Sequence, residues 1–182
     1  ADLVIVGIGA VPVDALAREA GLAVDNGIVV DDRLATADPH VFALGDCANF
    51  PVGPGGARMR LESVQNATDQ ARALAATLAG RPTPYDAVPW FWSDIGPMKL
   101  QIAGLLAGAD AEIATRHPDG TLKSLYHLAK GRLVAVETLN SAGEHMLARR
   151  LIGDGVTPPD EVLASGDTAR IKAAWQAATA VG

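Results

Sequence analysis

The stretch Thr36-Ala37-Asp38-Pro39-His40-Val41-Phe42-Ala43-Leu44-Gly45-Asp46 is the most specific segment of this 182-residue sequence. Its pattern predicts a short strand over Val41–Leu44 that ends at Gly45 and Asp46. Open α/β sheets bind ligands at the carboxyl ends of their strands, where a glycine permits close approach and a carboxylate accepts hydrogen bonds from ligand hydroxyls. A simple strand-ending turn uses the same two residues, so the dipeptide alone leaves both interpretations open.

The first residues predict another buried strand. A strand is predicted over residues 2–7, where Leu3-Val4-Ile5-Val6 is a continuous aliphatic run. It ends in Gly7-Ile8-Gly9, a turn whose backbone could approach a phosphate or nicotinamide group. Pro12 stands where the third glycine of a dinucleotide fingerprint belongs, so an ordinary tight turn is an equal alternative. A buried parallel strand needs neighbouring strands, and none precedes this one. We therefore expect the chain to be the back part of a longer protein.

Around these strands the sequence predicts a short helix over residues 14–20, a strand over Ile28–Val30 and a surface loop over residues 51–57. Apolar residues at helical spacing predict a long helix over Val64–Leu78. Glu62-Ser63-Val64 stands at the start of that helix. Its exposed N–H groups favour an anion-binding site, and Ser63 also suits a plain N-cap; the two roles are compatible.

Gly80–Pro84 breaks the chain, since two prolines and a glycine end any continuing element. We therefore predict one domain over residues 1–81 and a second over residues 82–182. In the second, hairpin signals replace the α/β alternation. The expected elements there are strands over Ile113–Arg116, Leu122–Leu128 and Leu133–Thr138, and helices over Gly143–Ile152 and Thr168–Ala178.

The segment Pro89-Trp90-Phe91-Trp92-Ser93-Asp94 concentrates aromatic residues in a chain that is only 4% aromatic. Such a cluster is typical of a stacking surface or a partner contact. A packed strand at a domain junction explains it equally well.

Composition excludes several classes of function. A net charge of −6 and a pI near 5.1 argue against nucleic acid as a partner. Cys47 is the single cysteine, so no redox disulfide and no multi-thiolate metal site can form, and the four histidines lack metal-ligand spacing. No segment predicts a membrane span or a signal peptide, so we expect a cytoplasmic location and no membrane partner.

Four motifs in this order, VIVGIGAVP, TADPHVFALGDCA, ESVQNATDQA and PWFWSD with KLQIAGL, carry a family resemblance. The chain resembles the carboxyl-terminal portion of the FAD-dependent NAD(P)H:ferredoxin reductases that serve monooxygenases and dioxygenases. The resemblance implies an incomplete α/β FAD/NAD-binding segment followed by a small α+β reductase carboxyl-terminal domain. Ile95-Gly96-Pro97 departs from the family pattern, which is acidic and aromatic there.

The resemblance also implies roles for particular residues. Asp46, next to Gly45, would hydrogen-bond the ribityl chain of FAD, and Ser63 and Val64 would face the pyrimidine edge of the flavin. A further set would line the nicotinamide cofactor or lie close to the flavin. These are Gly7 and Gly9 with Glu62 for the nicotinamide, and Trp92 for the flavin. The flavin would carry the chemistry, so no side chain is predicted to be catalytic.

The partner implied is a [2Fe–2S] ferredoxin, which by family resemblance is acidic. Because the chain is itself acidic, docking would need a local basic patch, for which Arg58, Arg60 and Lys99 are the candidates. Two alternatives remain: a fragment or interaction module that binds no cofactor, and a related flavoprotein whose electrons go to another acceptor. We expect the isolated chain to be inactive.

Overall fold

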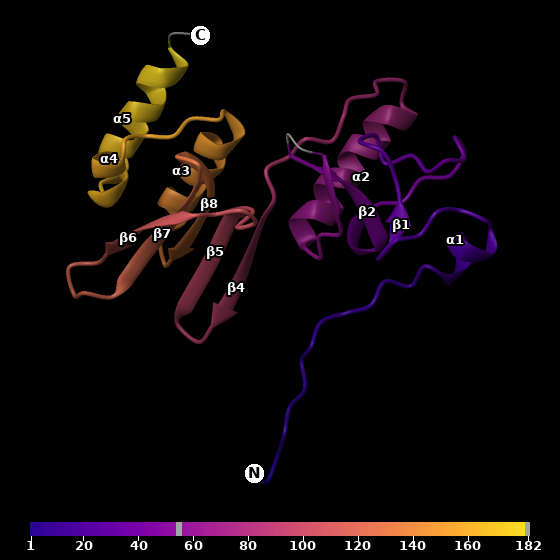
Figure 1. Ribbon diagram of the computed structural model, residues 1–182, viewed down its shortest axis with the longest axis horizontal. Helices are drawn as coiled ribbons and strands as arrows, with labels where there is room; N and C mark the ends of the chain where they lie inside the picture. The colour runs from indigo at the N-terminus through magenta and orange to yellow at the C-terminus, as the bar shows by residue number, and fades with distance from the viewer. Residues whose placement is uncertain (54–55, 181–182) are drawn as a thin grey trace. The chain divides into compact units, whose positions relative to one another are not determined.

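A computed structural model describes residues 1–53 and 56–180 of the chain. It divides into two compact units, Ala1–Asp86 and Ala87–Gly182, which we call the first and second units and describe separately. Figure 1 shows the elements of each.

The first unit is built on a small mixed sheet in the order β1-β2-β3. β1 (Ile28–Val29) pairs in parallel with β2 (Ala48–Val52), which pairs antiparallel with β3 (Ala57–Met59). Beside the sheet lie α1 (Ala15–Glu19), the 3₁₀ turn η1 (Gly45–Cys47) and α2 (Val64–Leu78). The apolar core of this unit is small. It consists of Val30, Leu34, Ala43, Ala48 and Phe50.

Two strands predicted in the first unit do not form. Residues 2–7 adopt no strand, and Leu3, Val4, Ile5 and Val6 are 72–85% exposed, because no described strand pairs with them. Val41–Leu44 is likewise not a strand: Phe42 makes only an isolated bridge to Ala35. A single bridge satisfies too few backbone groups to extend into a ladder.

The loop predicted over residues 51–57 is in part a hairpin. Pro51 and Val52 end β2, and Ala57 begins β3 opposite Val52. Residues 54–55 of this prediction lie outside the described part of the chain. The helix predicted over residues 14–20 is confirmed as α1, and the helix over Val64–Leu78 is confirmed at both ends.

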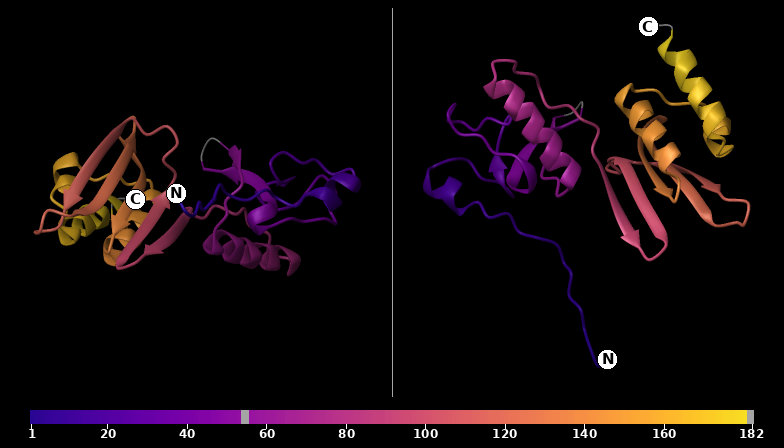
Figure 2. Two further views of the ribbon diagram at one scale, coloured as in Figure 1. Left: turned by 90° about the horizontal axis from the view of Figure 1, so that it is seen from below. Right: turned by 180° about the vertical axis from the view of Figure 1, so that it is seen from behind.

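The second unit is an antiparallel five-stranded sheet with helices packed on it (Figure 2). The strand order is β4-β5-β8-β7-β6, from β4 (Trp90–Ile95), β5 (Met98–Gly104), β6 (Ala111–Arg116), β7 (Leu122–Ala129) and β8 (Arg132–Leu139). The helices are α3 (Ala142–Gly153), α4 (Asp160–Ala164) and α5 (Thr168–Thr179). Each helix contributes a leucine or isoleucine to one core shared with the strands. That core includes Tyr126, Val136, Leu147, Leu151, Leu163 and Ile171.

The strands and helices predicted within residues 111–179 are confirmed, with ends shifted by at most two residues. The Pro118-Asp119-Gly120 turn forms as expected: the Gly120 N–H donates to the His117 carbonyl, and the Asp119 carboxylate accepts the Thr121 N–H at 2.9 Å. Helix α4 and strand β5 were not predicted. Helix α4 has only five residues, too few for a periodic pattern to be visible in the sequence.

One buried carboxylate ties α3 to the sheet. Glu144 accepts hydrogen bonds from Tyr126 and Ser141 and pairs with Lys123 at 2.8 Å, with its own side chain 1% exposed. Burial opposes ionisation of Glu144, but the hydrogen bonds from Lys123 and Tyr126 outweigh it and hold the pKa of that carboxyl below its usual value. The stability that this contributes is present above the ordinary pKa of a glutamate and is lost as the pH falls through the lowered pKa.

Gly104 at the end of β5 provides a test of the close packing of β5 against β8. It has φ +82°, and a Cβ there would lie 2.0 Å from the Val134 carbonyl oxygen and 2.9 Å from Ala135 Cα. We expect Gly104→Ala to destabilise the second unit by more than about 3 kcal/mol, because backbone cannot move aside cheaply. Gly108→Ala is the matched control, since Gly108 has the same φ of +82° with nothing within 4 Å. It should cost only about 1 kcal/mol in urea unfolding. Equal losses for the two variants would contradict the clash.

Candidate cofactor-binding site

Gly45 and Asp46 form the 3₁₀ turn η1 rather than the end of a regular strand. Gly45 has φ +72°, and a Cβ there would meet the Ala67 Cβ of α2 at 3.3 Å, so the turn packs directly on the helix. Asp46 is exposed, and within the described residues its carboxylate has no hydrogen bond or ion pair. The turn therefore presents a carboxylate that is free to accept hydrogen bonds from a ligand.

The turn is held by a polar residue of α2. Gln70 is fully buried, and its Oε1 accepts the Gly45 N–H at 2.7 Å. One turn earlier, Asn66 donates to the Leu61 carbonyl at 3.0 Å and accepts from the Tyr85 hydroxyl at 3.3 Å. Helix α2 thus fastens the chain on both sides of the candidate site with amides rather than with apolar side chains.

Sequence reasoning missed Gln70 and Asn66. The apolar residues that predict α2 include Leu78, which is 68% exposed, whereas the fully buried side chains of the helix are amides. The available signal was spacing: Asn66 and Gln70 stand four residues apart and therefore share one face.

The start of α2 supplies N–H groups to the same region. Ser63 is the N-cap, and its Oγ accepts the Asn66 N–H at 3.1 Å. Val64 follows as the first helical residue and is 67% exposed. The cap satisfies one of the free N–H groups of the first turn. The remaining N–H groups and the helix dipole give this terminus a positive potential.

Arg60 connects three segments predicted to contact cofactor. Its Nη1 donates to the Asp46 carbonyl at 3.0 Å and to the Glu62 carboxylate, and its Nη2 donates to the Ala10 carbonyl at 3.3 Å. Its side chain is 9% exposed, against 38% for Glu62. The structure places this guanidinium inside the site, where it is poorly suited to the docking role expected from the sequence.

The segment with Gly7 and Gly9 is extended and open. Nothing lies within 4 Å of a Cβ built on either glycine, and Gly9 has φ +94°. Within the described residues, the side-chain hydrogen bond that reaches this segment comes from Arg60, which donates to the Ala10 carbonyl. Among the first unit's predicted site residues, Gly45, Asp46, Glu62 and Ser63 are thus brought to η1 and the start of α2, with residues 7–10 tethered there by Arg60.

Arg58 is used within the sheet. Its guanidinium donates to the carbonyls of Val30 and Asn49, the latter at 2.7 Å. These bonds brace β3 against the neighbouring strands. Arg58 is an exposed residue, unlike Arg60, but its guanidinium is hydrogen-bonded to these two carbonyls.

In the second unit, the aromatic segment lies on β4, where Trp90 is partly buried and the residues from Phe91 to Ile95 are exposed. Trp90 packs against the core, with its ring centroid 5.3 Å from that of His145, while Trp92 is 42% exposed. Burial, with the nearby Arg149 charge, lowers the pKa of His145 to about 4, so this imidazole is neutral at physiological pH. Trp92 is therefore the tryptophan of β4 available to a ligand or partner.

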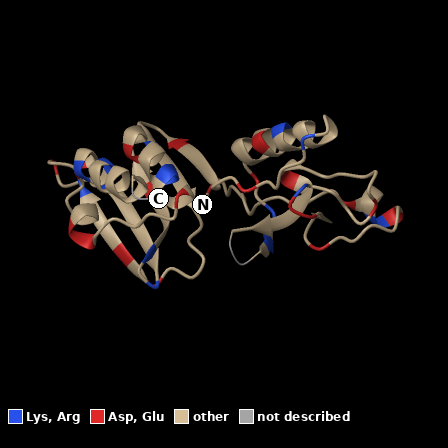
Figure 3. Ribbon diagram, turned by 90° about the horizontal axis from the view of Figure 1, so that it is seen from above, with Lys and Arg blue, Asp and Glu red and all other residues tan. Residues whose placement is uncertain are grey.

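Lys99 lies at the start of β5 and is 52% exposed, with its Nζ 3.9 Å from Asp94. An exposed pair at this distance contributes little stability and leaves the ammonium accessible. Charge is unevenly divided between the units, as Figure 3 illustrates. The first unit has six Lys and Arg against eleven Asp and Glu, and the second has nine against ten. The second unit is therefore the less repulsive one for an acidic partner.

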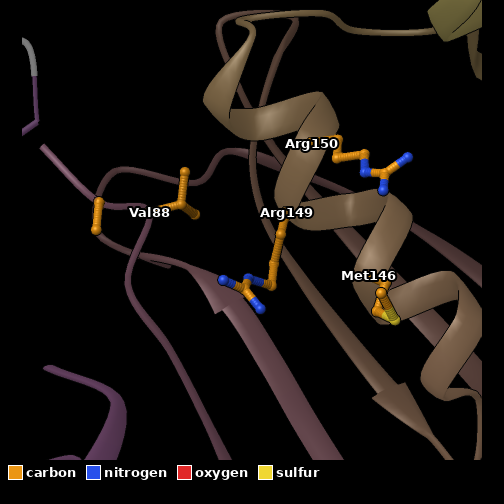
Figure 4. A pocket seen from close by; sticks show the side chains of 5 residues that line it. Val88, Met146, Arg149 and Arg150 are labelled. Carbon is orange, nitrogen blue, oxygen red and sulfur yellow. The ribbon is translucent and has the colours of Figure 1, made fainter. Parts of the chain in front are cut away.

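A pocket of about 400 Å³ also lies on the second unit, lined by Ala87, Val88, Met146, Arg149 and Arg150 (Figure 4). Arg149 lies over the Trp90 ring, 4.6 Å from its centroid, and Arg150 lies 5.4 Å from the centroid of Trp175.

Within the described residues there is no group of side chains that could hold a metal ion. None of the helices described is long and apolar enough to cross a membrane.

Comparison with known proteins shows which families the two units match. Residues 1–71 match the family described as pyridine nucleotide-disulphide oxidoreductase, and residues 90–174 match the family described as Reductase C-terminal. Rhodocoxin reductase of Rhodococcus erythropolis is 47% identical over 92% of this chain and 39% of its own length. Putidaredoxin reductase of Pseudomonas putida is 43% identical over 85% of this chain and 36% of its own length. The chain thus spans about two fifths of the curated relatives it matches.

Two solved structures are similar as well. The ferredoxin reductase for the CYP199A2 system from Rhodopseudomonas palustris has a TM-score of 0.87 and 44% identity, covering 95% of this chain and 43% of that one. The covalent putidaredoxin reductase–putidaredoxin complex has a TM-score of 0.88 and 40% identity, covering 97% and 43%.

The fold and the family matches define part of a pyridine nucleotide-disulphide oxidoreductase fold followed by a reductase carboxyl-terminal domain. More narrowly, the chain belongs to the ferredoxin reductase family of the putidaredoxin, rhodocoxin and rubredoxin reductases. That family uses FAD and NAD(P)H.

The Gln70–Gly45 bond can be tested directly. We expect Gln70→Ala to lower the free energy of unfolding of the first unit by about 1–3 kcal/mol, because the buried Gly45 N–H loses its acceptor. Arg72→Ala on the same helix is the control: it removes an ion pair to Asp69 whose arginine is 74% exposed. It should change stability by less than about 0.5 kcal/mol in urea unfolding. A Gln70→Ala loss as small as the control's would show that the bond does not hold the turn.

Proposed function

We propose that this chain supplies flavin, nicotinamide and partner contacts to an NAD(P)H:ferredoxin reductase of an oxygenase electron-transfer chain. The observation that carries the proposal is the unpaired Asp46 carboxylate, presented on a turn that Gln70 holds against α2. The family supports the reaction: relatives include proteins named ferredoxin–NAD(P)⁺ reductase and rubredoxin–NAD⁺ reductase.

The residues present fit FAD. When bound, the flavin would accept a hydride from NAD(P)H and release electrons singly. Asp46 would accept hydrogen bonds from the ribityl hydroxyls, and Gly45 would let the backbone lie close to them. The amino-terminal end of α2, at Ser63 and Val64, would place positive potential at the pyrimidine edge, where negative charge develops on reduction.

Glu62 would hold the nicotinamide carboxamide. Its carboxylate is partly exposed and is oriented by Arg60, which leaves acceptor capacity for an amide N–H. Gly7 and Gly9, which present no side chain, would let the cofactor lie against the backbone.

The acidic iron–sulfur partner would meet exposed groups near β4 and β5. Lys99 on β5 is accessible for this contact. Trp92 on the paired strand β4 is also exposed, and we assign it to the neighbourhood of the flavin. Arg58 and Arg60 are engaged internally, so Lys99 is the candidate that we retain from the sequence for docking.

Replacing Asp46 tests the flavin assignment. In the full-length, flavin-binding protein, Asp46→Ala should weaken FAD binding by about 1–3 kcal/mol, the loss expected for hydrogen bonds to a charged acceptor. Fluorescence titration of the apoprotein with FAD gives the affinity. Asp38→Ala is the matched control, because Asp38 lies in the same segment but its carboxylate accepts the His40 N–H at 2.8 Å. Unchanged FAD affinity in Asp46→Ala would show that Asp46 is only a turn residue.

Reversing Lys99 tests the docking assignment. Lys99→Glu should slow ferredoxin reduction at low ionic strength and flatten its salt dependence, since exposed charges act mainly on the association rate. Ferricyanide reduction, which needs no protein docking, should stay nearly unchanged.

Lys130→Glu is the control, because it makes the same charge change in the turn between β7 and β8. This turn lies at the start of β8, whereas the end of β8, at Leu139, pairs with Leu100 beside Lys99. The Lys130→Glu variant should leave ferredoxin reduction nearly unaffected. If Lys99→Glu slows both acceptors equally, the damage is to the flavin site and the docking assignment fails.

A further inference from the structure

Arg60 is the buried cation of the first unit's site, and each of its described contacts is an acceptor in a different predicted cofactor segment. Ala10 belongs to the segment with Gly7 and Gly9, Asp46 to the flavin turn, and Glu62 to the start of α2. A planar guanidinium can serve three acceptors in fixed directions, which a lysine ammonium on a flexible stem cannot do as well.

The surrounding backbone makes room for this side chain. Gly27 has φ +121°, and a Cβ there would lie 3.0 Å from Arg60 Cδ and 2.7 Å from the Cys47 carbonyl oxygen. Any larger residue at position 27 would clash with both the Arg60 side chain and the Cys47 carbonyl at the end of η1. The Asn26-Gly27 turn thus leaves open the volume through which Arg60 reaches the site.

The Glu62 carboxylate depends on this arrangement. It is the more exposed member of the pair, and Arg60 is the charged group that fixes its position. Without Arg60, Glu62 would gain rotamer freedom, and a ligand would have to order it on binding.

We propose that Arg60 is a positioning residue for the nicotinamide cofactor: it fixes the Glu62 carboxylate and ties it to the turn at Asp46 and the segment at Ala10. This inference rests on the proposed function, because it takes Glu62 as the residue that meets the nicotinamide. It replaces the docking role that the sequence suggested for Arg60 with an internal one.

The test is a double-mutant cycle in the full-length protein, with Arg60→Gln, Glu62→Gln and the combined variant. Calorimetric titration with NAD⁺ and with NADP⁺, which cannot reduce the flavin, gives the dissociation constants, and the tighter cofactor is used throughout. We expect Arg60→Gln to weaken binding about tenfold, the size of one lost charge-assisted contact. The combined variant should bind no more weakly than Glu62→Gln alone, because Arg60 acts through Glu62.

Two further variants separate positioning from general stability. Arg60→Lys keeps the charge beside Glu62 without the guanidinium geometry and should recover part of the lost affinity. Arg58→Gln removes a guanidinium that is likewise bonded to two backbone carbonyls, those of Val30 and Asn49. It should lower the unfolding midpoint but leave nicotinamide affinity within about twofold.

The inference is overturned if Arg60→Gln leaves the affinity unchanged, if Arg58→Gln weakens binding equally, or if the two losses in the cycle simply add. The FAD content of the unmodified protein tests the proposed function separately. Calorimetry detects nicotinamide binding whether or not flavin is present, so a protein that held no FAD would refute the flavin role while the Arg60 comparison would still be decided.

Discussion

A hydrogen bond from the Gly45 N–H to the buried Gln70 Oε1 sets the geometry of the first unit's site. The bond joins a turn and a helix that are 25 residues apart in sequence, and it is formed where water is excluded. An unpaired N–H at that depth would cost free energy, so the turn has one favourable position on α2. Gly45 is buried against α2, and the next residue, Asp46, is exposed on the same turn.

The cost of leaving a buried backbone group unpaired also explains why α2 carries amides on its inner side. The first unit has a small apolar core, and loops rather than long strands approach the helix. Loops bring unsatisfied backbone groups with them, and an amide side chain can satisfy one while an alanine cannot. Asn66 and Gln70 therefore take positions that an amphipathic pattern would assign to leucine. The second unit differs: its five strands pair with one another, and its helices bury Leu147, Leu163 and Ile171. There the buried carboxylate of Glu144 accepts a hydrogen bond from Ser141 and pairs with Lys123.

Charged residues in this chain divide into those that hold the structure and those that remain available. Arg58 and Arg60 look alike in sequence to Lys99, since each flanks a segment expected near the flavin. Their chemistry separates them. The guanidinium groups donate to backbone carbonyls at 2.7 and 3.0 Å. The Lys99 ammonium instead lies 3.9 Å from Asp94 on an exposed hairpin. A forked donor suits several fixed acceptors, and a compact, strongly hydrated ammonium stays in water.

The family, the order of the motifs and most elements of the second unit could be predicted from the sequence. Hairpin turns and amphipathic helices are specified by local patterns such as Pro118-Asp119-Gly120. It also identified Asp46, Glu62 and Ser63 as candidates, since these stand beside recognisable glycines and helix starts. It was wrong about the strands at residues 2–7 and Val41–Leu44: aliphatic runs indicate a preference for a sheet, but only paired backbone groups make one. The bond from Gly45 to Gln70 and the inward direction of Arg60 became visible only in the folded chain. Both depend on hydrogen-bond partners distant in sequence, and such partners leave no periodic pattern in the chain.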